Sequence, residues 1–275
     1  MSKRRDYTRL ISPSGVADIT GMRLETLDAW FRSFLHLHEF DSIDPSMNGL
    51  QVGRRNREVQ RVAFAVDACV ETFHRATVWN ADILVVDHGI FWGREQAVRD
   101  AHYARLRHLI ERDLGLYAVH LPLDQHMVYG NNAQMALALE LEEIQPFGSF
   151  RGKNIGCMGS FATPVSLDSV VTRLFGSSDA PLAVLPFGAT QIRTVGMVSG
   201  GGGSSLDEAV EKSLDLFITG DASHTLYHRA LESAISVVFG GHYLTEIWGV
   251  KALAEKLSRE YPDVETTFID VPTGL

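Results

Sequence analysis

Two kinds of hydrophobic pattern alternate along this chain. Short runs of apolar and β-branched residues, such as residues 83–86, 116–119 and 236–239, are typical of buried β-strands. Longer stretches with one polar face, including residues 24–37 and 167–175, are typical of amphipathic helices. This alternation predicts an α/β fold with layered sheets and the helices outside them.

The pattern occurs twice. Residues 61–89 match residues 194–222 without a gap, at an offset that pairs Asp82 with Asp215 and His88 with Asp221. Each copy has the order strand, turn, helix, strand. The chain therefore contains an internal repeat, and two copies of one unit predict two similar α/β modules.

The modules have predicted boundaries. The first covers residues 23–145 and the second covers residues 150–275, with room for segments to intertwine. Proline and glycine in residues 146–152 indicate the junction between them. Residues 1–22 carry no clear pattern and are expected to form a flexible tail.

Composition excludes several classes of protein. With 45% hydrophobic and 21% charged residues, the 275-residue chain is typical of soluble globular proteins. Its net charge of −9 argues against a nucleic-acid partner. No apolar run approaches the ~20 residues that cross a bilayer, so no membrane association is expected. Two cysteines, Cys69 and Cys157, predict no disulfide framework, and a cytoplasmic location is expected.

Histidines and carboxylates follow three of the predicted strands. They are Asp87, His88, His120, Asp124, His242 and Glu246. Imidazole and carboxylate suit divalent transition metals, and a carboxylate can bridge two ions. The set therefore predicts two divalent metal ions. Three carboxylates cancel three of their four positive charges, which leaves one charge for a hydroxide or an anionic substrate.

The repeat distributes these residues unevenly. Residues 105–120 resemble residues 227–242, so His120 and His242 end equivalent strands. The first module supplies four of the six candidates and the second supplies two, and Asp221 stands where the first copy has His88. A ligand site between two modules is common. We therefore expect one composite site and not two separate ones.

Each pair also has a simpler interpretation. In the simpler interpretation, Asp87 and His88 only end a strand at a surface turn. In the metal interpretation, both side chains can reach one pair of ions only if the chain turns at Gly89. Pro122 predicts that the segment from His120 to Asp124 is an extended loop and not a helix. The third pair, His242 and Glu246, is spaced to share one side of a first helical turn, or else Glu246 only caps that helix.

Two further features receive weaker assignments. The run Gly200–Gly203 lacks the rest of a phosphate-binding motif, so a mobile loop near the site is the favoured interpretation. His224 is the candidate for a catalytic proton donor.

These motifs together resemble the NIF-three-like dinuclear metal-centre family, many members of which are labelled GTP cyclohydrolase I type 2 homologues. The segments that carry the resemblance lie at residues 48–53, 87–92, 120–132, 220–224 and 241–246. The resemblance implies an α/β fold of two similar modules, a ring-shaped homohexamer and metal sites that face an inner cavity. One position departs from the family: Asp87 stands where the usual motif begins with histidine.

Two functions follow from this resemblance and these residues. The first is a metal-dependent hydrolase that uses two ions of zinc, manganese or iron on a small, nucleotide-like substrate. The second is a non-catalytic metal-binding regulatory or assembly protein. A mixed histidine and carboxylate set favours the hydrolase, because structural zinc sites are more often closed by cysteine.

Overall fold

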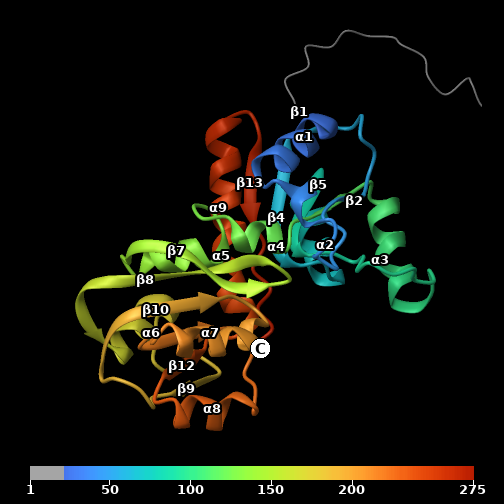
Figure 1. Cartoon of the computed structure of the whole chain (residues 1–275). Helices are drawn as coiled ribbons and strands as arrows, with labels where there is room; N and C mark the ends of the chain where they lie inside the picture. Colours follow the sequence, from blue (N-terminus) through green and yellow to red (C-terminus); the bar gives the residue numbers. More distant parts are fainter. Residues whose placement is uncertain (1–21) are drawn as a thin grey trace, which may run out of the picture.

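The computed structural model describes residues 22–275, so residues 1–21 of the predicted tail lie outside the described part (Figure 1). Two sheets, each covered by helices, form the body of the protein. Among the described residues, no helix has the length and apolar character needed to cross a membrane.

The first sheet is mainly parallel. Its strands are β2 (Gly49–Val52), β4 (Arg61–Asp67), β5 (Ile83–His88), β6 (Gly115–Ala118) and β13 (Glu265–Phe268). The spatial order is β13-β4-β5-β6-β2, in which only β2 runs antiparallel to its neighbour. Parallel strands bring their carboxyl ends to one edge, which is where β5 delivers Asp87 and His88.

Helices cover both faces of this sheet. They are α1 (Leu24–Phe34), α2 (Val70–Val78), α3 (Asp100–Glu111) and α9 (His242–Glu260). Successive side chains of a strand point to opposite faces. Phe64 of β4 therefore packs in a core with α1 and α9, whereas its neighbours Ala63 and Ala65 pack in a core with α2 and α3. The sheet is buried on both sides, as its continuous apolar runs predict.

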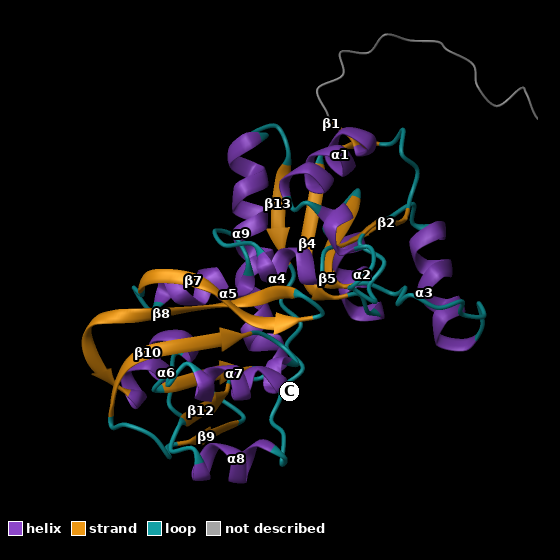
Figure 2. Cartoon of the chain, in the orientation of Figure 1, coloured by secondary structure: helices purple, strands orange, loops and turns teal. Residues whose placement is uncertain are grey.

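The second sheet combines parallel and antiparallel strands (Figure 2). Its strands are β7 (Glu142–Phe150), β8 (Lys153–Ser166), β9 (Ala183–Leu185), β10 (Gln191–Val198), β11 (Leu216–Thr219) and β12 (Ser236–Phe239). Their order is β7-β8-β10-β11-β12-β9, with β10, β11 and β12 parallel. Helices α5 (Asn131–Ala138) and α6 (Leu167–Phe175) cover one face, and α7 (Leu206–Glu211) and α8 (Leu226–Glu232) cover the other.

Several short elements complete the chain. They are β1 (Met22–Arg23), β3 (Glu58–Val59), the 3₁₀ helices η2 (Leu37–Phe40) and η3 (Gly202–Ser205), and helix α4 (Leu121–Gln125). Strand β1 pairs with β3 beside the first sheet. Helix α4 follows β6 directly and carries Asp124 toward the site.

The internal repeat is visible in matching hydrogen bonds. Asp82 accepts the backbone N–H groups of Gln60 and Arg61 at 2.8 and 2.9 Å. In the second copy, the side chain of Asp215 accepts the N–H groups of Arg193 and Thr194, both at 2.9 Å. In both copies the aspartate precedes one parallel strand directly and bonds to the backbone of the strand beside it. The two sheets thus share one local design, and the α/β fold with two similar units is confirmed.

The predicted junction at residues 146–152 is wrong. These residues lie in the hairpin of β7 and β8, whose turn is Arg151 and Gly152. Pro146 is accommodated because β7 is an edge strand, where a missing N–H costs no ladder bond on the open side. The chain enters the second sheet earlier, at Glu142.

The C-terminal segment returns to the first sheet. Helix α9 packs beside α1, and β13 pairs with β4, so the last elements of the chain lie beside the first ones (Figure 1). Gly249 lets α9 approach α5 closely, because a Cβ there would lie 2.7 Å from the side-chain oxygen of Asn131. This crossing brings α9 to the ends of β5 and β6.

Candidate metal centre

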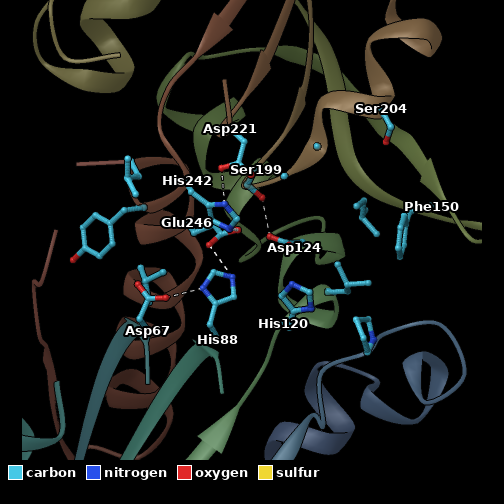
Figure 3. A pocket seen from close by; sticks show the side chains of 18 of the residues that line it. Asp67, His88, His120, Asp124, Phe150, Ser199, Ser204, Asp221, His242 and Glu246 are labelled. Carbon is cyan, nitrogen blue, oxygen red and sulfur yellow. Dashed lines mark hydrogen bonds and ion pairs between the residues drawn. The ribbon is translucent and has the colours of Figure 1, made fainter. Parts of the chain in front are cut away.

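One cavity of about 650 Å³ lies where β5, α4 and the start of α9 meet (Figure 3). His88, His120, Asp124, His242 and Glu246 all line it. They come from both predicted modules and from positions as far apart as 88 and 246 in the chain. The structure therefore brings the three predicted pairs together at one place.

The potential ligand atoms form two groups that share one histidine. Asp87, His88 and His120 make the first group, and His88, His242 and Glu246 make the second, with atoms within 4.8 Å of one another in each. The carboxylate of Glu246 lies between two imidazoles. Its Oε1 is 3.1 Å from Nε2 of His242, and its Oε2 is 3.3 Å from Nε2 of His88.

The start of α9 follows the sequence prediction. His242 is the first residue of the helix and Glu246 lies one turn later, so both side chains face the cavity. Gly241 precedes them with φ of 93°, a left-handed conformation that glycine adopts without strain. Thr245 bonds to the preceding turn instead, through the carbonyl oxygen of Gly241 at 2.9 Å.

The segment after β6 differs from its prediction as an extended loop. It forms helix α4, with Pro122 in the first turn and His120 immediately before it. Proline is tolerated there because the first N–H groups of a helix have no intrahelical acceptor. The short helix buries Asp124, whose side chain lies on the same cavity as His120.

Each histidine is held by a carboxylate behind it. Nδ1 of His88 lies 3.0 Å from Asp67, Nδ1 of His120 lies 2.8 Å from Asp44, and Nδ1 of His242 lies 2.8 Å from Asp221. Such contacts orient the ring, keep the proton on Nδ1 and make Nε2 a better metal ligand. All three imidazoles are therefore arranged as metal ligands are.

Two of these supporting carboxylates, Asp44 and Asp67, were not found from the sequence. A signal existed for Asp67, because parallel pairing of β4 with β5 places it opposite His88 at the two strand ends. Asp44 lies in a loop without periodicity. Burial opposes its ionisation, but hydrogen bonds from His120, Asn48 and Ser46 outweigh that effect and hold the pKa of Asp44 below its usual value.

Asn131 connects two of the candidate ligands. Its amide nitrogen donates to Asp87 at 3.0 Å and to Asp124 at 2.8 Å, while its side-chain oxygen accepts the N–H of Gly249 at 2.7 Å. The bond to Gly249 fixes which way the amide faces. Ser199, at the end of β10, also donates to Asp124 at 2.8 Å.

Burial and neighbouring charges shift the pKa values of several side chains in the site. Burial, together with the nearby charge of Glu246, raises the pKa of Asp124 to about 6 and that of Asp87 well above its usual value. Burial opposes protonation of His242, but Glu246 and Asp221 outweigh it and raise the pKa of His242 to about 10. Closely packed acids and imidazoles of this kind exchange protons for a bound cation.

Two buried oxygens support the presence of metal. Oδ1 of Asp87 and Oε2 of Glu246 are inaccessible to solvent and accept no hydrogen bond. A buried carboxylate oxygen that accepts no hydrogen bond costs about 1–3 kcal/mol or more, and for Oε2 of Glu246 the ion-pair contact with Nε2 of His88 at 3.3 Å offsets part of that cost. Both atoms belong to the two candidate ligand groups, so divalent cations fit the residues present.

The glycine-rich turn borders the site. Gly200 has φ of 56°, and a Cβ there would collide with Glu246 and His242. Its carbonyl oxygen accepts the N–H groups of Gly220 and Asp221, both at 2.9 Å. The glycine at this position thus lets the backbone pass next to the candidate ligands, and Gly89 similarly leaves room for the side chain of Gln51.

Two of the predicted site residues, His224 and Asp87, do not line the cavity. His224 is exposed, just before α8, and is not among the residues that line the cavity. Asp87, the position that departs from the family motif, is fully buried and its carboxylate lies within the first ligand group. Its strand continues to His88, and Gly89 is the first residue after the strand.

The fold and the cavity define a two-unit α/β protein with a candidate metal centre between the units. The chain belongs to the Duf34/NIF3 (NGG1p interacting factor 3) family, whose profile matches residues 22–274. A relative from Treponema pallidum named "GTP cyclohydrolase 1 type 2 homolog" is 42% identical over 92% of this chain and 100% of its own length. A relative of the same name from Pyrococcus abyssi is also 42% identical, with the same coverage.

Solved structures share the fold. A crystal structure of a protein from Thermus thermophilus has a TM-score of 0.83 at 35% identity and covers 92% of this chain and 100% of its own. The structure titled "Reduced HcgD from Methanocaldococcus jannaschii" has a TM-score of 0.78 at 25% identity, with the same coverage. The family resemblance inferred from the sequence motifs is confirmed.

Proposed function

We propose that this protein binds two divalent metal ions and uses them to hydrolyse a small molecule. The ions are zinc, manganese or iron, and the ligands are Asp87, His88, His120, Asp124, His242 and Glu246. The observation that carries the proposal is the arrangement of three imidazoles, each supported at Nδ1 by an aspartate, around two buried carboxylate oxygens that accept no hydrogen bond.

The bound ions would lower the pKa of a water molecule and polarise the bond to be cleaved. The protein's own groups would prepare that chemistry. Asp44, Asp67 and Asp221 hold the imidazoles in one orientation, and Asn131 holds Asp87 and Asp124. Glu246 lies where it can contact both groups of ligands.

The cavity supports catalysis over a purely structural role. Five of the six proposed ligands line a cavity of about 650 Å³, which is large enough for a small substrate. The names of the curated relatives also refer to a hydrolase. The alternative is a metal-binding regulatory or assembly protein without turnover. It requires that protein ligands fill every coordination position of the ions, so that no position is open to water or substrate. His224 is exposed away from the cavity lining, so it is not part of this proposal.

Metal content tests the site. Glu246→Gln and His120→Ala should each lose most of the bound metal of the dialysed protein, although the two residues lie far apart in the sequence. Glu255→Gln, an exposed residue on the same helix, and His228→Ala, an exposed histidine of α8, are matched controls and should retain it. Metal content at the level of the unchanged protein in both site variants would disprove the six-residue site.

Turnover separates the two functions. The metal-loaded protein should hydrolyse at least one compound in a screen of esters, cyclic amides, phosphoesters and nucleotides, and Glu246→Gln should abolish that activity.

The family resemblance adds a homohexamer to the proposal. Light scattering should then report six copies of the 30.4 kDa chain, and a monomer at micromolar concentration would contradict the assembly.

A further inference from the structure

The surroundings of the metal centre are strongly acidic. Three proposed ligands are carboxylates, Asp87, Asp124 and Glu246. Three more, Asp44, Asp67 and Asp221, support the histidines. Two divalent ions carry four positive charges, so the six carboxylates leave two negative charges on the loaded site. The net charge of the loaded site is therefore negative. Counting the three ligand carboxylates alone gave one positive charge, which would have favoured an anionic substrate.

The cavity offers no compensating cation. Among residues 22–275, its lining includes no lysine or arginine. Two cationic side chains follow Phe150 closely in the sequence, but both bond to groups that do not line the cavity. Arg151 donates to the carbonyl oxygen of Ile43 at 2.8 Å, and Lys153 lies 2.6 Å from the carboxylate of Glu39. Proteins that recognise phosphates normally supply such groups.

Much of the cavity lining is apolar. Pro45, Leu121, Phe150 and Ile155 all line the cavity. Phe150 lies at the end of β7, across the cavity from Asp67, and Ser204 also lies on that far side (Figure 3). A substrate that reaches the metals would therefore place its other end against hydrocarbon.

We propose that the substrate carries no anionic group and has an apolar or aromatic portion that lies against Phe150 and Ile155. This inference rests on the proposed metal-dependent function and specifies its substrate class. It excludes nucleotides and other phosphorylated compounds as substrates, because the loaded site repels them and the described lining supplies no lysine or arginine to pair with a phosphate. Neutral esters, amides or lactams with an apolar side have the required chemistry.

Three small metal-binding compounds test this. Benzohydroxamic acid is aromatic, uncharged in neutral solution, and releases one proton to the solvent when it chelates a metal. Acetohydroxamic acid has the same metal-binding group without the ring, and phenylphosphonate has the ring with a group that is already anionic in solution. Their affinities for the metal-loaded protein would be measured by calorimetry at physiological ionic strength. We expect benzohydroxamic acid to bind about tenfold more tightly than acetohydroxamic acid, as burial of part of the ring predicts. It should also bind more tightly than phenylphosphonate.

Variants at the cavity wall sharpen the test. Phe150→Ala should remove the advantage of benzohydroxamic acid over acetohydroxamic acid, whereas Phe150→Leu should keep most of it. Ser204→Lys supplies the missing cation at an exposed lining residue, so it should strengthen phenylphosphonate binding. Ser204→Gln, similar in length but neutral, should not.

These measurements separate failure of the proposed substrate class from failure of the proposed metal-dependent function. If acetohydroxamic acid shows no metal-dependent binding, the proposed metal function fails and the substrate class fails with it. If it binds but phenylphosphonate binds more tightly than benzohydroxamic acid, only the substrate class is wrong. Equal affinity of the two hydroxamic acids would also overturn the proposed apolar portion.

Discussion

The carboxylates behind the histidines provide the sharpest prediction. Asp67→Asn keeps the size of the side chain and one acceptor oxygen for Nδ1 of His88, but it removes the negative charge. If His88 is a metal ligand, the imidazole becomes a weaker donor and metal affinity falls. If His88 only pairs with acids, metal affinity does not depend on Asp67.

The structure sets the size of this effect. Loss of such a supporting carboxylate typically costs 10–100-fold in metal affinity. The side chain of Asp67 is 36% exposed, so water partly screens its charge and we expect the lower end, about tenfold. Asp221 supports His242 in the same way but is 55% exposed, so Asp221→Asn should have a smaller effect, about threefold.

Competition with a coloured zinc chelator would measure these affinities. Asp82→Asn is the control, because Asp82 accepts two backbone N–H groups away from the cavity and should affect stability without changing metal affinity. Unchanged affinity in Asp67→Asn would refute the role assigned to the outer carboxylates. A larger loss in Asp221→Asn than in Asp67→Asn would refute the inference from exposure.

Three further predictions concern the inner residues. Asp87→His should raise zinc affinity relative to manganese, because imidazole suits zinc better than an extra carboxylate, and a competition titration in which Asp87→His and Asp87→Asn both leave the preference unchanged would contradict this. Asn131→Ala removes two hydrogen bonds to buried carboxylates and should lower the free energy of unfolding by about 3 kcal/mol in urea, so an unchanged transition would show that these bonds contribute little. The folded-state pKa of Asp124, raised to about 6 by burial and Glu246, means that the folded metal-free protein holds this proton more tightly than the unfolded chain. That stability is fully present below about pH 4 and is lost as pH rises past about 6, and the raised pKa of His242 acts in the same direction at higher pH. The stabilisation by metal, measured as the difference in melting temperature between loaded and metal-free protein, should therefore be larger at pH 7.5 than at pH 5, and an equal or smaller difference would contradict the assignment.

Much of the fold could be predicted because it depends on local pattern. The apolar runs and the repeat located the parallel strands, and the matched pair Asp82 and Asp215 immediately precedes the equivalent strands β5 and β11. The junction at residues 146–152 failed because proline and glycine fit an edge hairpin as well as a linker. The return of α9 and β13 to the first sheet depends on long-range packing, which periodicity does not report.

For the candidate site, the sequence indicated the inner residues but not all of the carboxylates that support them. Strand ends located the inner residues, since parallel strands place their carboxyl ends at one edge of a sheet. The outer residue Asp44 could not be found in this way, because it reaches His120 from a loop 76 positions away in the chain. Pro122 misled the local prediction, since a proline at the start of a helix and one in a loop look alike in sequence.

The location of bound metal tests the central claim most directly. Crystals of the metal-loaded protein, measured by anomalous scattering at the absorption edge of the bound metal, would show where each ion lies. We predict two peaks in the cavity for each chain, one among Asp87, His88 and His120 and the other among His88, His242 and Glu246. A fully loaded protein with no peak in this cavity, or with peaks only elsewhere, would contradict the proposed metal centre.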